Sequence, residues 1–206
     1  MKTISGTLAC VFLAMIASAQ HIVVKNGTDS ATYTDVDQYL MAHTTREGYW
    51  KLYNSNNLLV EEGPYSENKK NGKWTRFFYN GKKSEEVNYV NDKPSGKMIF
   101  YYETGGLREE GTWVDRHWVG DYRMNYENGK PQYVWVFDEA GTRTGSQLYF
   151  YENGNTMIEG DWKAGLEAGA VKEYFDDGSL KSEKNFAKGI VDSVSIKVYE
   201  PKARIP

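Results

Sequence analysis

The decapeptide GKWTRFFYNG at residues 72–81 decides the fold of this chain. It begins with a glycine and continues with the aromatic and β-branched residues that are typical of a strand. It ends on Asn-Gly, a dipeptide that favours the two-residue type I′ turn of a β-hairpin, because both central residues of that turn need a positive φ. Asn-Gly or Asp-Gly recurs at Asn128-Gly129, Asn153-Gly154 and Asp177-Gly178. The segment therefore predicts one strand and the turn of a hairpin, and its recurrence predicts several hairpins.

The glycine that opens this segment returns at a nearly constant spacing. The successive spacings are 24, 24, 24, 25 and 24 residues, and the glycines are Gly48, Gly72, Gly96, Gly120, Gly145 and Gly169. If each of these glycines is position 0 of a unit, position 17 is always aromatic and position 14 is glutamate in every unit except the fourth. Fixed periods of this size indicate a repeat architecture. Six units therefore fill residues 48–192, and a partial seventh begins at Ser193.

The composition agrees with a folded, hydrophilic repeat. The chain has 206 residues, a formal net charge of −3 and 15% aromatic residues, with a mean hydropathy of −0.67. Of its 30 aromatic residues, 27 lie at position 48 or later. Disordered chains are poor in aromatic residues, and the near-neutral charge lacks the basic surface that nucleic-acid-binding proteins carry. We therefore expect a folded protein that does not bind nucleic acid.

The repeat predicts an all-β fold. Each unit reads as a hairpin, with a second turn near the next opening glycine, as at Asn71-Gly72. Since one hairpin is marginal alone, the predicted fold is an elongated single-layer antiparallel meander of six to seven 24-residue β-hairpin repeats with a small N-terminal cap. This meander is preferred to a closed propeller, because 24 residues are too few for a four-stranded blade.

Pairing across a two-residue turn predicts which side chains share a face of the sheet. Positions 3 and 14 lie opposite each other, as do positions 5 and 12, so Lys51 faces Glu62 and Lys172 faces Glu183. Opposite charges across a strand pair support this register. The other face collects positions 2, 4, 6, 13, 15 and 17 and is the more apolar one. Glycine at position 15 leaves room beside the aromatic residue at position 17, and we expect the aromatic rings to stack as a ladder along the sheet.

The N-terminus has the features of an export signal at residues 1–19. Lys2 precedes the short apolar run 8–16, and Ala17-Ser18-Ala19 forms a cleavage site, which predicts a mature start at Gln20. Cys10 is the single cysteine of the chain. A lipoprotein signal that uses Cys10 is the alternative, but the residues before this cysteine fit a lipobox poorly. No second apolar stretch exists, so the sequence predicts no transmembrane segment and an exported protein that is periplasmic, associated with the cell envelope or secreted.

The flanks of the repeat predict closing elements. Residues 20–47 do not repeat and are expected to cap the first edge of the sheet, with a strand near His21–Val24 and a short helix over 34–42. Open sheet edges invite aggregation, which is why a cap is expected. Residues 193–206 form a closing half-repeat and tail, in which 194–199 alternates as a last strand and Pro201 ends the ladder.

The unit G-x-W-x-x-[FY]-[FY]-x-N-G-x-x-x-x-E-x-x-[YW] resembles the MORN-repeat variant found in YwqK-type antitoxin components. Residues 72–81 and 145–154 carry the match, and the resemblance covers 48–192. It implies a protein-binding or toxin-neutralising role, and MORN proteins in general are linked to scaffolding and membrane association. The chain departs from the pattern at Asn57, Pro64 and Val134, and in the 25-residue length of the fourth unit.

The sequence indicates no catalytic, cofactor-binding or metal-binding residues. The histidines His21, His43 and His117 are not at metal-ligand spacing. The glutamates recur with the period of the repeat, which favours a structural role, whereas a catalytic pair would break the period. The clearest breaks are 115–118 and 133–135, and we expect them to be a longer turn and a more apolar strand.

We therefore expect a non-enzymatic, exported protein-binding or scaffold module. A row of Tyr and Trp on one sheet face is a typical interface. The predicted partner-binding face comprises Trp74, Phe78, Tyr89, Tyr102, Trp113, Tyr126, Tyr151 and Trp162. Another protein is the expected partner, with a toxin as one candidate. An antitoxin-like immunity protein and an extracellular carbohydrate-binding module that takes a glycan are the alternatives.

Overall fold

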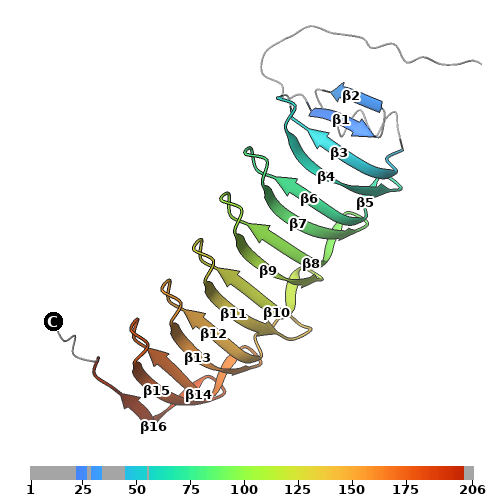
Figure 1. Cartoon of the computed structure of the whole chain (residues 1–206). Helices are drawn as coiled ribbons and strands as arrows, with labels where there is room; N and C mark the ends of the chain where they lie inside the picture. Colours follow the sequence, from blue (N-terminus) through green and yellow to red (C-terminus); the bar gives the residue numbers. More distant parts are fainter. Residues whose placement is uncertain (1–21, 27–28, 34–44, 55, 202–206) are drawn as a thin grey trace, which may run out of the picture.

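The protein is one long antiparallel sheet, as the repeat predicts. The computed structural model describes residues 22–26, 29–33, 45–54 and 56–201. Within these residues the regular structure consists of strands, and sixteen of them form a single sheet. Figure 1 shows the hairpins following one another along an elongated molecule, from β1 and β2 at one end to β16 at the other. The predicted all-β meander is confirmed.

The strands follow each other in the sheet almost in chain order. The order runs from β16 down to β6 and then through β4, β3, β1 and β2, while β5 pairs with β4. The strands are β1 Ile22–Asn26, β2 Asp29–Tyr33, β3 Gly48–Tyr53, β4 Leu59–Ser66, β5 Lys69–Lys70, β6 Gly72–Phe77, β7 Lys83–Val90, β8 Lys93–Tyr101, β9 Leu107–Val114, β10 His117–Asn125, β11 Pro131–Phe137, β12 Gly145–Phe150, β13 Thr156–Lys163, β14 Leu166–Tyr174, β15 Leu180–Ala187 and β16 Ile190–Val198.

The Asn-Gly turns differ from the prediction. In the second unit Phe78 N donates to Lys82 O at 2.8 Å and Gly81 N donates to Phe78 O at 3.0 Å. Gly81 has a φ of 80°, whereas Asn80 is not among the residues with positive φ. This is a three-residue loop, a type I turn followed by a left-handed glycine. The prediction of a type I′ turn at Asn80-Gly81 was therefore wrong.

The type I′ turns lie instead at the other end of the units. Asn91 and Asp92 join β7 to β8 with φ values of 51° and 65°, and the flanking residues Val90 and Lys93 pair directly. The second turn was predicted near each opening glycine, as at Asn71-Gly72, but it lies a few residues earlier, at Glu67-Asn68 in the first unit. Gly96 lies inside β8 with a φ of 90°, where the register with β7 shifts. There it forms part of a bulge, which bends the bulged strand.

The extra residue of the fourth unit changes the class of its second turn. Asp138 N donates to Thr142 O at 2.9 Å, and Gly141 N donates to Asp138 O at 3.0 Å. Gly141 is the turn residue with positive φ. The unit has replaced a two-residue loop by a three-residue loop, which accounts for its length of 25 residues.

The predicted register holds along the strands and fails near the turn. Lys51 pairs with Glu62, and Lys172 pairs with Glu183, so positions 3 and 14 lie opposite each other. Positions 5 and 12 do not, because Phe77 pairs with Lys83 at position 11. The glycine of the three-residue loop causes a one-residue shift, and the same shift recurs in the other hairpins.

The two ends of the repeat carry different elements. At the N-terminal end β1 pairs with both β2 and β3, so this hairpin extends the sheet beyond the first unit. The helix predicted over 34–42 and the export signal over 1–19 lie outside the described residues. At the C-terminal end β16 is offset by one residue from the predicted phase, because Glu183 pairs with Lys197 rather than with Ile196. The bulge in β16 is one residue longer than those in β8 and β14.

The core is a row of side chains at position 2 of the units. Each is at most 8% exposed, and the row comprises Trp50, Trp74, Met98, Tyr122, Gln147 and Val171. Gly63 at position 15 lies directly beneath the Trp74 indole of the next unit. The small residue at position 15 therefore makes room for position 2 of the following unit, and not only for the aromatic residue at position 17.

Candidate interaction surface

The two faces of the sheet carry different chemistry. We call the side with positions 3 and 14 the glutamate face and the side with positions 2, 4, 13, 15 and 17 the aromatic face. On the glutamate face Lys51 lies 3.2 Å from Glu62, and Lys97 lies 2.9 Å from Glu110. The recurring glutamates are thus ion-pair partners within the sheet, which supports the structural reading of their period.

Glu86 is the most enclosed of these glutamates. It is 6% exposed, and it contacts Lys73 at 2.8 Å and Lys83 at 2.7 Å, while the Tyr101 hydroxyl donates to it at 3.0 Å. Burial by itself would raise the pKa of Glu86, but the hydrogen bonds from the two lysines and the tyrosine outweigh burial and lower the pKa to about 2. Burial and the hydrogen bond to Glu86 raise the pKa of Tyr101 to about 12.

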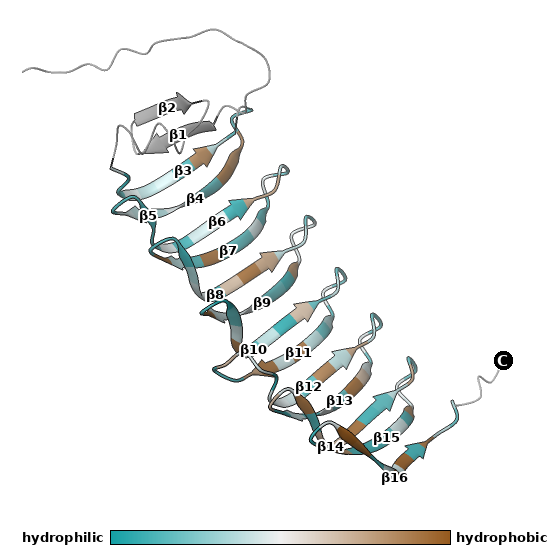
Figure 2. Cartoon of the chain, turned by 180° about the vertical axis from the view of Figure 1, so that it is seen from behind, coloured by the Kyte–Doolittle hydropathy of each residue, from teal (hydrophilic) through white to brown (hydrophobic). Residues whose placement is uncertain are grey.

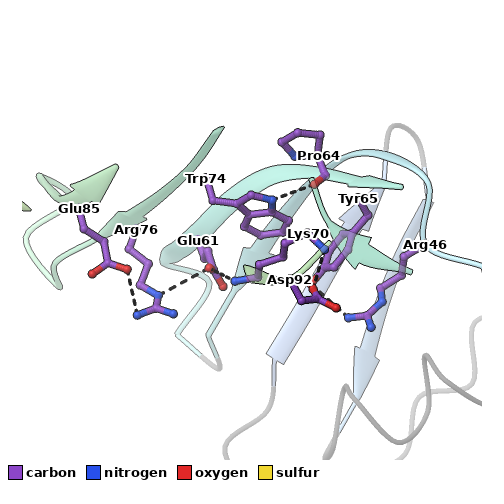
Figure 3. Close-up of polar contacts among 9 residues, drawn as sticks. All are labelled: Arg46, Glu61, Pro64, Tyr65, Lys70, Trp74, Arg76, Glu85 and Asp92. Atoms are coloured by element: carbon purple, nitrogen blue, oxygen red, sulfur yellow. Dashed lines mark hydrogen bonds and ion pairs between the residues drawn. The ribbon is translucent and has the colours of Figure 1, made fainter. Parts of the chain in front are cut away.

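The aromatic face begins with a small packed cluster, of which Figure 3 shows Tyr65 and Trp74. The Tyr65 ring contacts Trp50 and Trp74 edge-to-face, with ring centroids 5.9 and 4.8 Å apart. The Trp74 indole donates to the Pro64 carbonyl at 2.8 Å, and the Arg46 guanidinium lies 4.4 Å from the centre of the Tyr65 ring. These rings are buried by one another, so this cluster serves the fold.

Charged residues line the same face beside this cluster. Glu61 forms an ion pair with Lys70, and Arg76 reaches Glu61 at 3.6 Å and Glu85 at 3.1 Å. Figure 3 shows Arg76 between the two carboxylates. The first part of the aromatic face is therefore an alternating, internally paired charge network.

Further along the chain the aromatic face changes to a continuous run of rings. Each ring in this run contacts at least one other, with centroid separations from 4.6 to 6.4 Å. We call this run the aromatic tract; it comprises Trp113, Trp118, Tyr122, Tyr133, Trp135, Phe137, Tyr149 and Trp162. The predicted ladder of aromatic residues is thus present over five strands, from β9 to β13.

The two breaks in the repeat period meet in this tract. Trp118 comes from the first break, and Tyr133 and Trp135 come from the second. The ring centroids of Trp118 and Tyr122 lie 5.2 Å apart. Tyr122 stacks on Trp135 with a centroid separation of 5.6 Å, and Trp135 stacks on Tyr133 with one of 4.6 Å. The expectation of a longer turn at 115–118 was wrong, because Asp115 and Arg116 form the same kind of two-residue turn as Asn91 and Asp92. The expectation of a more apolar strand at 133–135 was incomplete, because the fold brings both breaks to one surface.

Arg143 supplies the positive charge of the tract. Its guanidinium lies 5.8 Å from the centre of the Trp135 ring and 5.6 Å from that of Trp162. It also donates to the Tyr149 hydroxyl at 2.7 Å. Burial raises the pKa of Tyr149, although Arg143 opposes this effect. The tyrosine therefore stays neutral, and the tract combines rings, hydroxyl groups and one cation.

The eight residues predicted to form a partner-binding face fall into three groups. Trp74 and Trp162 are buried, at 2% and 6% exposure, so their rings are part of the core. Phe78, Tyr89 and Trp113 are half-buried. The third group consists of tyrosines at position 6, whose hydroxyls donate to backbone carbonyls of the next hairpin at 2.6 to 2.8 Å, namely Tyr102, Tyr126 and Tyr151. The structure brings Trp113 and Trp162 together in the aromatic tract and leaves the other six outside it.

Sequence reasoning missed seven members of this surface, namely Trp118, Tyr122, Tyr133, Trp135, Phe137, Tyr149 and Arg143. A search for residues that depart from the repeat on the aromatic face would have found four of them, because Trp118, Tyr133, Trp135 and Arg143 lie in or beside the irregular segments. Tyr122, Phe137 and Tyr149 occupy regular positions, so the period alone gives no reason to choose them.

The part of the chain that the structure describes holds no group of three or more His, Cys, Asp or Glu residues that could bind a metal ion. Nor do the described residues include a helix with the length and apolar character needed to cross a membrane.

A comparison with protein families finds five copies of the MORN repeat variant in the chain. The matched residues are 70–91, 94–115, 118–139, 143–164 and 168–188. They include all or nearly all of every strand from β6 to β15. No curated protein matches the chain. The first unit, with its Asn57 and Pro64, falls outside the matched segments, and the YwqK-type resemblance stays a prediction.

Proposed function

Because the chain belongs to the MORN repeat variant family, we propose that it is a non-enzymatic scaffold that binds another protein through the aromatic tract. Repeat proteins of this type present extended surfaces to their partners. Tyr, Trp and Arg dominate the binding energy of protein interfaces, and the tract contains all three.

The main support is the contrast between the fourth unit and the first three. At position 13 those units carry Glu61, Glu85 and Glu109, which form ion pairs or hydrogen bonds with neighbouring residues. The fourth unit carries Tyr133 there, and it replaces the glutamate at position 14 by Val134. Because charged residues suffice for the fold at position 13, the fold alone does not require the ring of Tyr133.

Two further features support a role beyond stability. Six rings of the tract are only half-buried, namely Trp113, Trp118, Tyr133, Trp135, Phe137 and Tyr149. In addition, the indole nitrogens of Trp135 and Trp162 are buried and have no hydrogen-bond partner within the described structure. An unsatisfied buried donor costs about 1–3 kcal/mol, which a cluster kept for stability alone would be expected to avoid.

The ring arrangement favours a protein over a glycan as the ligand. Sugars bind to the open faces of aromatic rings, but here the rings of Tyr122, Trp135 and Tyr133 stack on one another with interplanar angles of 22° and 26°. Their faces are therefore largely occupied by each other. The edges and hydroxyl groups that remain suit the mixed surface of a protein.

The test uses two substitutions that each restore the repeat pattern. Tyr133→Glu restores the glutamate of position 13 and removes a ring from the tract. Val134→Glu restores the glutamate of position 14 on the opposite face, where Arg123 is its cross-strand neighbour. Both variants should fold. We expect Tyr133→Glu to weaken binding of the partner at least tenfold in pull-downs from the cell-envelope fraction, and Val134→Glu to bind like the wild type. Equal binding by all three proteins, or binding to a glycan array without a protein partner, would contradict the proposal.

We also propose that the protein is exported. The support is the pattern of residues 1–19, with a charged start, a short apolar run and a small-residue cleavage site. Mass spectrometry of the protein purified from its native cells should give an N-terminus at Gln20. An intact Met1 in the cytoplasmic fraction would refute export, and a lipid on Cys10 would favour the lipoprotein alternative.

A further inference from the structure

A cation recurs at one place of the repeat, over an aromatic ring of the aromatic face. It lies two residues before the opening glycine, as Lys70 before the second unit and as Arg143 before the fifth. The Lys70 ammonium lies 5.3 Å from the centre of the Tyr89 ring, and the Arg143 guanidinium lies 5.6 Å from that of Trp162. Both rings stand at position 17 of the unit that follows the cation. Lys70 and Arg143 are therefore equivalent residues at two places in the sheet.

The two cations differ in their carboxylate partner. Lys70 forms an ion pair with Glu61, which is position 13 of the preceding unit, and Figure 3 shows this contact beside the Trp74 indole. The residue at position 13 of the unit that precedes Arg143 is Tyr133. The carboxylate that pairs with the cation in the first part of the sheet is thus replaced by a phenol in the aromatic tract.

Arg143 has no carboxylate partner among the described residues. Within them its guanidinium makes one hydrogen bond, to the Tyr149 hydroxyl at 2.7 Å. Glu167 lies on the same face as the cross-strand partner of Trp162, but no ion pair joins it to Arg143 in the described part of the chain. Other cations of this face lie 3.1 Å from a carboxylate, namely Arg76 beside Glu85 and Lys184 beside Glu173. Arg143 therefore departs from the charge pairing of its own face.

Neighbouring rings hold the Arg143 guanidinium in place. Trp135 comes from β11 and Trp162 from β13, and Figure 2 shows β11, β12 and β13 side by side. The centres of these two rings lie 5.8 and 5.6 Å from the guanidinium, which stays half-buried. A guanidinium presents its N–H donors in a rigid fork that matches a carboxylate. Because the fold already orders this side chain, binding an anion there costs less conformational entropy.

The accessible polar groups around Arg143 are donors as well. The Tyr149 hydroxyl accepts the hydrogen bond from Arg143, and its own proton has no acceptor among the described residues. The Tyr133 hydroxyl accepts a bond from Gln132 Nε2 at 3.4 Å and also has a proton to donate. An unpartnered acceptor on this face, Gln147 Oε1, is fully buried. Around Arg143 the tract therefore offers donors and a positive charge, which an anionic acceptor complements.

We propose that the partner protein places the carboxylate of an aspartate or glutamate on Arg143, at the site that Glu61 fills beside Lys70. This inference rests on the proposed function and adds the chemistry of the partner, which is an acidic residue flanked by apolar side chains that contact the rings. An apolar partner without the acid would cover Arg143 and leave its charge unpaired, which weakens binding. A carboxylate fits better than a phosphate, because phosphate groups are recognised by clusters of arginines.

The first test selects peptides against the immobilised protein from a phage library of random sequences. The selected peptides should share an aspartate or glutamate beside apolar residues. Replacing this acid by its amide in synthetic peptides should weaken binding to the wild type about tenfold in titration calorimetry. The same replacement should change the affinity for Arg143→Gln less than about twofold, while Arg143→Lys, which keeps the charge, should retain the preference. Arg123→Gln is the matched control, because Arg123 lies on the glutamate face opposite Val134, and it should behave like the wild type.

The outcomes separate this inference from the proposed function. Peptides that lose affinity in Tyr133→Glu bind the tract. If such peptides lack a shared acid, or if their acid matters equally in the wild type and in Arg143→Gln, the inference is overturned and the proposed function stands. Selected peptides that bind Tyr133→Glu as tightly as the wild type would contradict the proposed function as well.

The second test needs no partner. Tyr133→Glu restores the carboxylate of position 13, which should reach Arg143 as Glu61 reaches Lys70. Arg143→Gln should therefore raise the unfolding equilibrium constant about threefold more in the Tyr133→Glu background than in the wild type, as urea denaturation of the four proteins measures. Equal effects in the two backgrounds would show that a carboxylate at this site does not engage Arg143, and would overturn the inference.

Discussion

At the scale of single residues, glycines on the aromatic face fit the volume of the next unit's core side chain. A Cβ at Gly63 would overlap the Trp74 indole, whereas a Cβ at Gly106 would meet its nearest neighbour, the carbonyl oxygen of Glu127, at 3.9 Å. Neither glycine has a positive φ. We therefore expect Gly63→Ala to lower the free energy of unfolding by about 1–3 kcal/mol through overpacking, and Gly106→Ala to change it by less than about 1 kcal/mol. Urea denaturation measures both, and equal effects would contradict the packing argument.

The Glu86 cluster makes stability depend on pH. The pKa of this carboxyl is lowered in the folded protein to about 2, so the unfolded chain binds a proton first as the pH falls. The stabilisation by Glu86 is therefore complete above pH about 4.5 and is lost as the pH falls toward about 2. Glu86→Gln should cost about 1–3 kcal/mol at pH 7, because it removes a charged partner of Lys73 and Lys83. The variant should also lose less stability between pH 5 and 3 than the wild type does, as urea denaturation at several pH values can show; parallel pH profiles would refute this role.

At the scale of elements, the sixth hairpin tests the charge pairing. Lys172 lies opposite Glu183 in the ladder, yet its ammonium reaches Glu159 on the preceding strand at 3.4 Å. Lys172→Glu would therefore place a third carboxylate between two others. Because these side chains are partly exposed, we expect a loss of only about 0.5–1 kcal/mol, which salt should screen. Urea denaturation at low and high ionic strength measures both effects, and a loss that does not depend on salt would argue against the ion pairs.

The sequence predicts strands and their order better than it predicts turns. The recurring positions of the unit identify the strands, because each position occupies an equivalent site in every hairpin of the sheet. Turn type depends in addition on contacts between units: the Asp92 N–H donates to Lys70 O of the preceding unit at 3.0 Å, and the Gly165 N–H donates to Arg143 O at 3.0 Å. The first of these bonds helps hold Asp92, which is not a glycine, at positive φ, and no local dipeptide reveals such bonds. The positive φ of Asn57 has a simpler explanation, since asparagine tolerates the left-handed conformation that Gly81 adopts in the next unit.

At the scale of the whole molecule, the repeat predicts the sheet but not the surface. The aromatic tract arises where units differ from one another. A consensus sequence of the repeat averages over the units and therefore omits those differences. The offset of β16 is also invisible to the period, because Ser193 takes the place of the expected glycine and the bulge grows by one residue. What the period does predict is that whole units can be exchanged, since each contacts only its neighbours.

Deleting one unit keeps the phase of the strands and changes only the packing between neighbouring units. Removal of residues 90–113 takes out 24 residues and joins Tyr89 to Val114, so the strand phase is preserved. Val87 then occupies the site of Gly111, where a Cβ alone would lie 2.9 Å from Trp118 and 3.3 Å from Tyr122. In the full chain Val87 is 5% exposed and pairs with Met98, so Val87→Gly should destabilise it by about 1–3 kcal/mol.

In the shortened chain the same substitution should have the opposite sign. Glycine at 87 would restore the space that Trp118 and Tyr122 need, so Val87→Gly should raise the free energy of unfolding by about 1–3 kcal/mol. Circular dichroism should first show that both shortened chains are folded sheets, and urea denaturation of the four proteins completes a double-mutant cycle. If Val87→Gly destabilised both backgrounds equally, the pairing of a small position 15 with a large position 2 would not govern how units join. A reversal of sign would show that neighbouring units must match in volume as well as in phase.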